Sequence, residues 1–379
     1  MKPADRVQQV PPSGIRRFFE LAEQRDEVIS LGVGEPDFAA PWAARDAAIT
    51  SLERGRTSYT ANRGRLELRE AIATHVEDSY DLAYDPEAEI VVTAGASEGI
   101  DLAFRALVNP GDTVAVAQPC YVSYVPGVLF AGGEVLSVPT RRGDAFKLTH
   151  DALDAAGAGE AEMLVLCYPN NPTGATMTGD ELSEVAEFAR EHDLTVLSDE
   201  IYAALSYEHE HTSIATLPGM RERTVVCNGF SKAYAMTGLR LGYVLAPPEI
   251  ATAMNRVHQY TLLSAPTTAQ EAAIEALSSC DDAVAEMQSR YDRRRKLLLS
   301  RFEEMGLDCF RATGAFYAFP ECPREDAGEF AEELLDETGV AAVPGPAFGD
   351  GGEGHLRVSY ATGIDDLKEA LDRIEAFIS

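Results

Sequence analysis

Short apolar runs alternate with amphipathic segments up to about residue 248, and this alternation constrains the fold more than any other feature of the chain. Each run ends in turn residues, and the segments between the runs carry apolar residues three and four positions apart, as helices do. Strands that alternate with helices form a mainly parallel sheet with helices on both faces. The predicted strands are Ile90–Thr93, Thr113–Val116, Met163–Leu166, Thr195–Leu197 and Thr224–Val226.

The pattern changes after residue 248, where longer helices and shorter strands follow. A chain of 379 residues has room for about two to three domains. We expect an α/β architecture with a large domain over residues 41–275, a smaller α/β domain over residues 276–379, and an N-terminal segment, residues 1–40, that packs on the small domain and on the ligand site. The later predicted elements are helices at Ala269–Leu277, Asp282–Met305 and Asp365–Ile378, and strands at Phe316–Phe319, Val340–Val343 and Leu356–Ser359.

Several chemically useful residues directly follow predicted strands. Lys232, one of only five lysines, comes after the strand at 224–226, Asp199 and Tyr202 come after the strand at 195–197, and Gly95-Ala96-Ser97 comes after the strand at 90–93. In an open parallel sheet the ligand lies beyond the carboxyl ends of the strands, so these residues can share one site. Taken singly, they could equally be a surface lysine, a helix cap and a tight turn.

These residue types suit pyridoxal phosphate. A Schiff base needs a neutral amine, and partial burial of Lys232 near a cation such as Arg240 would lower the pKa of that amine. The carboxylate of Asp199 could keep the pyridine nitrogen protonated, which makes the ring an electron sink, and Tyr202 could hydrogen-bond the phenolic oxygen. Arg240 and the backbone amides of Gly95-Ala96-Ser97, at the start of a helix, could bind the phosphate.

The sixteen residues from Asn228 to Tyr243, Asn-Gly-Phe-Ser-Lys-Ala-Tyr-Ala-Met-Thr-Gly-Leu-Arg-Leu-Gly-Tyr, resemble the lysine signature of the class I/II aminotransferases, which are pyridoxal-phosphate enzymes of fold type I. The likeness is greatest to the branch with aspartate, aromatic and N-acetyl-diaminopimelate aminotransferases. It implies a large domain with a mainly parallel, seven-stranded sheet between helices, and a smaller α/β domain. Other matching segments, in the family's order, are Gly34-Glu35-Pro36-Asp37-Phe38, Tyr59-Thr60-Ala61-Asn62-Arg63-Gly64, Asn170-Asn171-Pro172-Thr173-Gly174, Ser198-Asp199-Glu200-Ile201-Tyr202 and His355-Leu356-Arg357-Val358-Ser359-Tyr360-Ala361.

The resemblance implies a role for each matching cofactor residue. Lys232 would hold the cofactor covalently and then act as base and acid, with Asp199 and Tyr202 as the other catalytic residues. Asn171 would contact the phenolic oxygen, and the ring of Tyr121 would stack on the cofactor. The remaining cofactor-binding residues would be Gly95, Ala96, Ser97, Ser231, Arg240 and, reaching the neighbouring subunit of a homodimer, Tyr59.

The substrate residues follow from the same resemblance. Arg357 matches an arginine that binds the substrate α-carboxylate bidentately, and Gly34 and Asn171 would lie beside the same group. The stretch Ser13–Phe18 resembles a segment that folds over the substrate, so Ile15 and Arg16 are candidates for selecting the substrate side chain.

Two positions depart from the family pattern. Many members have a hydroxyl residue where this chain has Gly229, which implies a different distribution of the phosphate contacts here. Some aspartate-specific members have a lysine in the phosphate turn, where this chain has Ser97. Aspartate is therefore not assured as a substrate.

We accordingly expect an aminotransferase that moves the α-amino group of an L-amino acid to a 2-oxo acid, with 2-oxoglutarate as acceptor, by a ping-pong mechanism. A C–S lyase on the same fold is one alternative, because it would need the same lysine, aspartate and arginine. A non-enzymatic module that binds pyridoxal phosphate is another. No metal site is expected.

The charge balance bears on partners and habitat. The chain has 62 acidic and 32 basic residues, a formal net charge of -30, which disfavours nucleic acid and anionic membranes as partners. Acidic stretches such as 329–336 recur on predicted helix surfaces, so we interpret the charge as a surface suited to concentrated salt, as in a halophilic archaeon, rather than as an acidic binding segment. Without a visible export signal, an apolar run of ~18 residues or paired cysteines, we expect a cytoplasmic protein.

Overall fold

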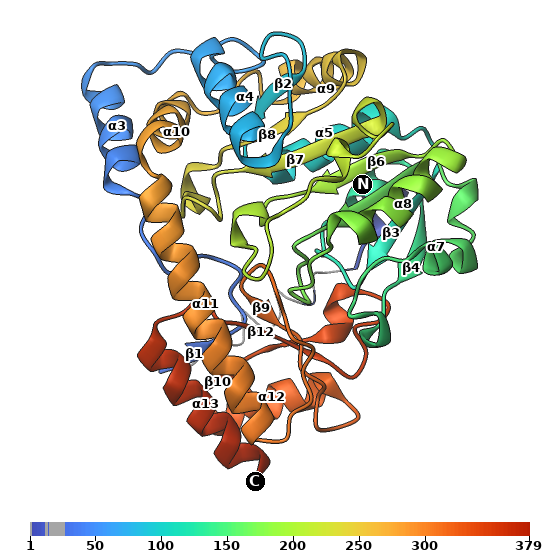
Figure 1. Ribbon diagram of the computed structural model, residues 1–379, viewed down its shortest axis with the longest axis vertical. Coiled ribbons are helices and arrows are strands. Elements are labelled where there is room, and N and C mark those ends of the chain that lie inside the picture. The colour runs from blue at the N-terminus through green and yellow to red at the C-terminus, as the bar shows by residue number, and fades with distance from the viewer. Residues whose placement is uncertain (1, 12–13, 15–26) are drawn as a thin grey trace.

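The computed structural model describes residues 2–11, 14 and 27–379, and a seven-stranded sheet lies at its centre (Figure 1). The strand order is β2-β8-β7-β6-β5-β3-β4, and only β8 runs antiparallel to its neighbours. This confirms the mainly parallel, seven-stranded sheet. The strands are β2 (Ile90–Thr93), β3 (Thr113–Gln118), β4 (Glu134–Pro139), β5 (Met163–Cys167), β6 (Thr195–Asp199), β7 (Thr224–Gly229) and β8 (Gly242–Leu245).

Five of these strands coincide with the apolar runs of the sequence, and β4 and β8 were missed. β4 is an edge strand that begins with the exposed Glu134 and buries only Val138 fully, so its sequence has no continuous apolar run. β8 is buried along its whole length, but it is short and begins at Gly242, a residue that usually marks a turn.

Helices cover both faces of the sheet, because successive strand residues point to opposite sides. Val114 and Val116 of β3 pack with α5 (Ala96–Leu107), α6 (Tyr124–Ala131) and α9 (Pro248–Thr261). Ala115 and Ala117 pack on the other face, with α7 (His150–Ala156) and α8 (Gly179–Glu191). The crossover helices therefore bury the sheet on both sides and leave its strand ends open for a ligand.

A third cluster covers the β2 end of the sheet. Ile90 and Val92 of β2 pack against α4 (Leu66–Tyr80) and α10 (Thr267–Ser279), and α3 (Trp42–Glu53) lies against α10. The short helix α1 (Asp5–Gln8) contacts α6.

The C-terminal part has its own core beside the long helix α11 (Asp281–Glu304), which runs from the large sheet to the smaller ones (Figure 1). The predicted helices and short strands of this part are present, although the strand expected at 340–343 is divided into two. The proposed domain boundaries stay a prediction. The elements are a three-stranded antiparallel sheet of β11 (Val343–Pro344), β12 (Leu356–Ser359) and β9 (Tyr317–Ala318), a parallel pair of β1 (Ile29–Ser30) and β10 (Val340–Ala341), and helices α12 (Ala327–Thr338) and α13 (Ile364–Ile378).

Two features of the described residues concern membranes and metal ions. Within residues 2–11, 14 and 27–379, no helix is both long and apolar enough to cross a lipid bilayer. The same part of the chain contains no group of three or more histidine, cysteine, aspartate or glutamate side chains placed to hold a metal ion.

Candidate active site

A cavity of about 450 Å³ lies beyond the carboxyl ends of the central strands. The structure brings nearly all of the predicted site residues to its walls, although they come from distant parts of the chain. Tyr59 does not line the cavity, Gly95 lies next to it against Arg240, and Ile15 and Arg16 fall outside the described residues. The predicted residues that line it are Gly34, Ala96, Ser97, Tyr121, Asn171, Asp199, Tyr202, Ser231, Lys232, Arg240 and Arg357.

Lys232 lies three residues beyond the end of β7 and points across the cavity. Its Nζ donates a hydrogen bond to the carbonyl oxygen of Gly34, at 2.6 Å. Burial lowers the pKa of this amine to about 8, with Arg357 and Arg240 adding to the effect and Glu35 opposing it. An amine with that pKa is partly neutral near pH 7, as a nucleophile must be.

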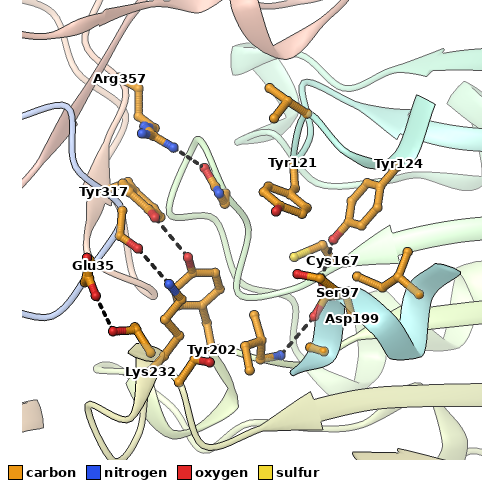
Figure 2. A pocket seen from close by; sticks show the side chains of 18 of the residues that line it. Glu35, Ser97, Tyr121, Tyr124, Cys167, Asp199, Tyr202, Lys232, Tyr317 and Arg357 are labelled. Carbon is orange, nitrogen blue, oxygen red and sulfur yellow. Dashed lines mark hydrogen bonds between the residues drawn. The ribbon is translucent and has the colours of Figure 1, made fainter. Parts of the chain in front are cut away.

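Asp199 is the last residue of β6 and is buried. Its Oδ2 accepts a hydrogen bond from the hydroxyl of Tyr124 at 2.6 Å, and its Oδ1 accepts one from the backbone N–H of Ile201 at 3.2 Å (Figure 2). Burial raises the pKa of Asp199 to about 6, against the lowering effect of both donors. A carboxylate in this position is well placed to meet a cationic ring nitrogen.

Tyr202 follows Asp199 by three residues, and its hydroxyl lies 2.9 Å from that of Tyr317. Burial raises the pKa of Tyr202 well above its ordinary value. The hydroxyl therefore keeps its proton at neutral pH and can donate to an oxygen of a ligand.

Arg357, in β12, is a buried cation on the opposite wall. Its Nη1 donates to Oδ1 of Asn171 at 2.9 Å and its Nη2 donates to the carbonyl of Gly32 at 2.6 Å. The guanidinium also lies over the ring of Tyr317, 4.5 Å from its centroid. Its Nε is buried and has no hydrogen-bond partner among the described residues. Such an unpaired donor on a buried cation indicates a site for an anionic group of a ligand.

The turn between β2 and α5 forms a cradle for a second anion. Gly95 precedes the helix with φ +82°, and a Cβ there would lie only 2.7 Å from Nη2 of Arg240. The first amides of α5 have no acceptors within the helix, and the helix dipole places partial positive charge at this end. The exposed Arg240 adds a full charge, which suits a phosphate.

The prediction from sequence missed eight residues that line the cavity, and three of them are apolar: Ile100, Val122 and Ile201. Tyr124 was within reach, because it lies three positions after Tyr121, at the start of the helix that follows it. Glu35, whose carboxylate accepts a hydrogen bond from the Thr237 hydroxyl, and Thr237 itself lie inside two of the matching segments but were not singled out. Cys167 and Tyr317 are brought to the cavity only by the fold.

These groups together fit pyridoxal phosphate. The turn at Gly95 with Arg240 could hold its phosphate, the carboxylate of Asp199 could pair with its ring nitrogen, and the amine of Lys232 could react with its carbonyl carbon. The unpaired Nε of Arg357 remains for a second ligand with its own carboxylate. The fold and the site therefore define a pyridoxal-phosphate enzyme of fold type I.

Comparisons with known proteins identify the family of this enzyme. The family model "Aminotransferase class I and II" matches residues 26–374. The chain is 50% identical over 377 residues to a putative aminotransferase of Bacillus subtilis, covering 99% of this chain and 98% of that protein, and 44% identical over 382 residues to an aspartate aminotransferase of Pyrococcus abyssi, covering 99% and 98%. Its structure is similar to that of an aromatic aminotransferase from Pyrococcus horikoshii, with a TM-score of 0.90, 43% identity and coverage of 96% and 98%. The chain belongs to the class I and II aminotransferases, which depend on pyridoxal phosphate.

Proposed function

We propose that this aminotransferase moves the α-amino group of an L-amino acid to 2-oxoglutarate by a ping-pong mechanism. The observation that carries the proposal is one cavity with a partly neutral amine, a buried carboxylate, a phosphate cradle and a second, unpaired carboxylate-binding donor. The choice of 2-oxoglutarate rests on the likeness to the family. Both substrates would use the same cavity in turn, as a ping-pong sequence requires.

The cofactor would be held at three points. Arg240, Ser97, Ser231 and the amide of Ala96 would bind the phosphate at the Gly95 turn, where the Gly95 N–H donates to the carbonyl of Thr93 at 2.9 Å. Asp199 would pair with the ring nitrogen, Tyr202 and Asn171 would contact the phenolic oxygen, and Tyr121 would cover the ring face. When bound there, pyridoxal phosphate supplies an electron sink for negative charge at the substrate α-carbon.

Lys232 would move the proton. Its Nζ would serve as a base within the cavity, and a pKa of about 8 would let it both take and return a proton near neutral pH. The carbonyl oxygen of Gly34, 2.6 Å away, would orient the amine lone pair by accepting one of its hydrogens.

Arg357 would orient the substrate. Its Nε would donate to one oxygen of the α-carboxylate, and Asn171 and the carbonyl of Gly32 fix the plane of the guanidinium by accepting from its other two nitrogens. A carboxylate fixed there leaves the α-carbon facing Lys232. Burial of the arginine among Tyr317 and Phe348 excludes water that would weaken the contact.

A panel of L-amino acids mixed with the purified holoenzyme tests the reaction. A true amino donor will bleach the yellow absorbance of the bound cofactor, and 2-oxoglutarate will restore it. The absence of bleaching with every amino acid would contradict the transaminase proposal. Release of pyruvate and ammonia without any acceptor would instead identify a C–S lyase.

We further propose a homodimer in which Tyr59 reaches the phosphate of the neighbouring site. Tyr59 is 79% exposed and Tyr260 is 85% exposed, and Leu262 and Leu263 are also exposed. Asn62 donates a hydrogen bond to the carbonyl of Leu263 at 2.8 Å, which holds the two segments next to each other. A second copy of the chain would cover it. The double variant Tyr260→Glu with Leu262→Glu should sediment as a monomer, and a wild-type chain that sediments as a monomer would contradict the dimer.

The excess of acidic residues supports a protein that works in concentrated salt, as in the cytoplasm of a halophilic archaeon. Charged side chains in excess, with a formal net charge of -30, remain hydrated in concentrated salt and repel one another in dilute buffer.

A further inference from the structure

We propose that Tyr124 is a positioning residue, whose hydroxyl keeps the carboxylate of Asp199 ionised and directed at the ring nitrogen of the cofactor. The inference rests on the proposed role of Asp199 and adds a second residue to it. Tyr124 would act through Asp199 and would not itself need to touch the reacting atoms.

The geometry of the carboxylate supports this role. Tyr124 is the first residue of α6, its side chain is 1% exposed, and its hydroxyl lies 2.6 Å from Oδ2 of Asp199 (Figure 2). The N–H of Ile201 donates to the other oxygen. Two donors from different elements therefore hold the two oxygens, and rotation of the carboxylate would break both hydrogen bonds.

Because Asp199 is buried, its carboxylate needs the Tyr124 hydroxyl as a hydrogen-bond donor, in addition to the Ile201 N–H, to stay ionised. Removal from water favours the neutral acid, and the neighbouring Glu200 carboxylate works in the same direction. The hydrogen bond from Tyr124 opposes both effects. Burial also raises the pKa of Tyr124 well above its ordinary value, so its hydroxyl keeps its proton and donates to the carboxylate throughout the working pH range.

Tyr121, three residues before Tyr124, is also expected to contact the cofactor. The ring of Tyr121 meets that of Tyr124 edge to face, with centroids 5.6 Å apart. Tyr121 is the ring expected to cover the cofactor face, and Tyr124 holds the partner of its nitrogen. The nearby thiol of Cys167 does not replace the hydroxyl, because a thiol is a weak hydrogen-bond donor.

The variant Tyr124→Phe tests the proposal, because it removes the hydroxyl and keeps the ring. The measurement is the Kd of the apoprotein for pyridoxal phosphate at pH values from about 5 to about 9, with steady-state kcat and KM of the holoenzyme. Tyr84→Phe is the matched control, since Tyr84 is also buried but its hydroxyl has no hydrogen-bond partner within the protein.

We expect the wild-type affinity to fall as the pH drops toward 6, where Asp199 takes up a proton. Loss of a hydrogen-bond donor raises the pKa of a carboxyl group. In Tyr124→Phe the affinity for pyridoxal phosphate should therefore begin to fall about one pH unit higher than in the wild type, and at low pH it should be about tenfold weaker. Well above that range the two Kd values should converge. Tyr84→Phe should follow the wild-type profile, and kcat of Tyr124→Phe should fall more than KM changes.

Two outcomes would overturn the proposal. One is a pH profile of Tyr124→Phe that coincides with the wild type. The other is a loss of affinity by the same factor at every pH, together with a lower melting temperature of the apoprotein, which would indicate only a packing role. Asp199→Ala separates this inference from the proposed function. If that variant binds the cofactor like the wild type, the role of Asp199 itself fails; if it binds weakly while Tyr124→Phe is normal, only the role of Tyr124 fails.

Discussion

At the scale of single residues, burial in the cavity changes the protonation and hydrogen bonding of several groups in this site. It lowers the pKa of the Lys232 amine and raises that of the Asp199 carboxyl, so both groups move toward the neutral pH range from opposite sides. Burial also leaves Nε of Arg357 without a partner. Titratable groups whose properties are shifted in this way, within one cavity, are characteristic of enzymes.

Replacement of Lys232 by alanine should separate cofactor binding from catalysis. The phosphate cradle and Asp199 would still bind pyridoxal phosphate, but no covalent link could form, and turnover should fall by many orders of magnitude. Borohydride reduction followed by mass spectrometry should find cofactor on the wild-type peptide alone. Lys296→Ala is the control, because Lys296 is an exposed lysine paired with Asp292; near-normal turnover in Lys232→Ala would remove the catalytic role of the lysine.

The pKa of Lys232 makes a separate prediction about pH. Only the neutral amine attacks the aldehyde, so the rate at which the apoprotein links pyridoxal phosphate should rise with pH and level off above about 8. At pH 7 the rate should be roughly one tenth of the plateau. Stopped-flow absorbance measures this rate directly. A rate that keeps rising to pH 10 would show that the amine has the pKa of an exposed lysine.

Some predicted site residues could be found because they follow a predicted strand within a recognisable run of residues. Lys232, Asp199 and Tyr202 could be found in that way. Tyr317 and Cys167 could not, because Tyr317 comes from the C-terminal sheet and Cys167 looks like an ordinary apolar strand residue. Packing between distant parts of the chain brings these two residues to the cavity, and no local sequence pattern indicates this.

At the scale of elements, the turn from β2 into α5 shows how a strand and a helix make a binding site together. The strand delivers the chain to the edge of the sheet, and the helix presents its amino end there. Such elements are readable in sequence because the apolar period changes from two to about 3.6 residues. β4 lacks that signal because most of its residues are only partly buried, and β8 lacks it because it begins at Gly242, a residue that usually marks a turn.

Gly95→Ala should disrupt this turn selectively. The added Cβ would lie 2.7 Å from Nη2 of Arg240, and alanine disfavours φ +82°. We expect the Kd for pyridoxal phosphate to rise at least tenfold, while the weaker binding of pyridoxal, which has no phosphate, changes little. Gly111→Ala is the matched control, because Gly111 has φ +90° and no atom within 4 Å of an added Cβ. An equal loss for both ligands would point to general misfolding instead.

At the scale of the whole molecule, the net charge of -30 leads us to propose that stability depends on the salt concentration. Repulsion among surface carboxylates destabilises the compact state, and dissolved salt screens it. This property was readable from composition alone, because it does not depend on where each side chain lies. The proposed partner surface at Tyr59 and Tyr260 was different, since it needed both segments to be placed in space.

The melting temperature should therefore rise with KCl between about 0.1 M and about 2 M, with the steepest rise at the low end, where the screening length shortens most. Sucrose at matched osmolality is the control, because it is excluded from the protein surface but does not screen charge. Differential scanning calorimetry measures both series. A melting temperature that is flat or falls with KCl would contradict the interpretation of the acidic surface.

The exposed position of Tyr59, outside the cavity that holds Lys232 of the same chain, has a consequence for genetics. If Tyr59 serves the neighbouring subunit, an allele with Lys232→Ala and an allele with Tyr59→Ala carry defects in different halves of a shared site. In a mixed dimer, the subunit with the intact lysine receives the intact tyrosine from its neighbour. Two alleles that each fail alone should then complement one another when expressed in the same cell.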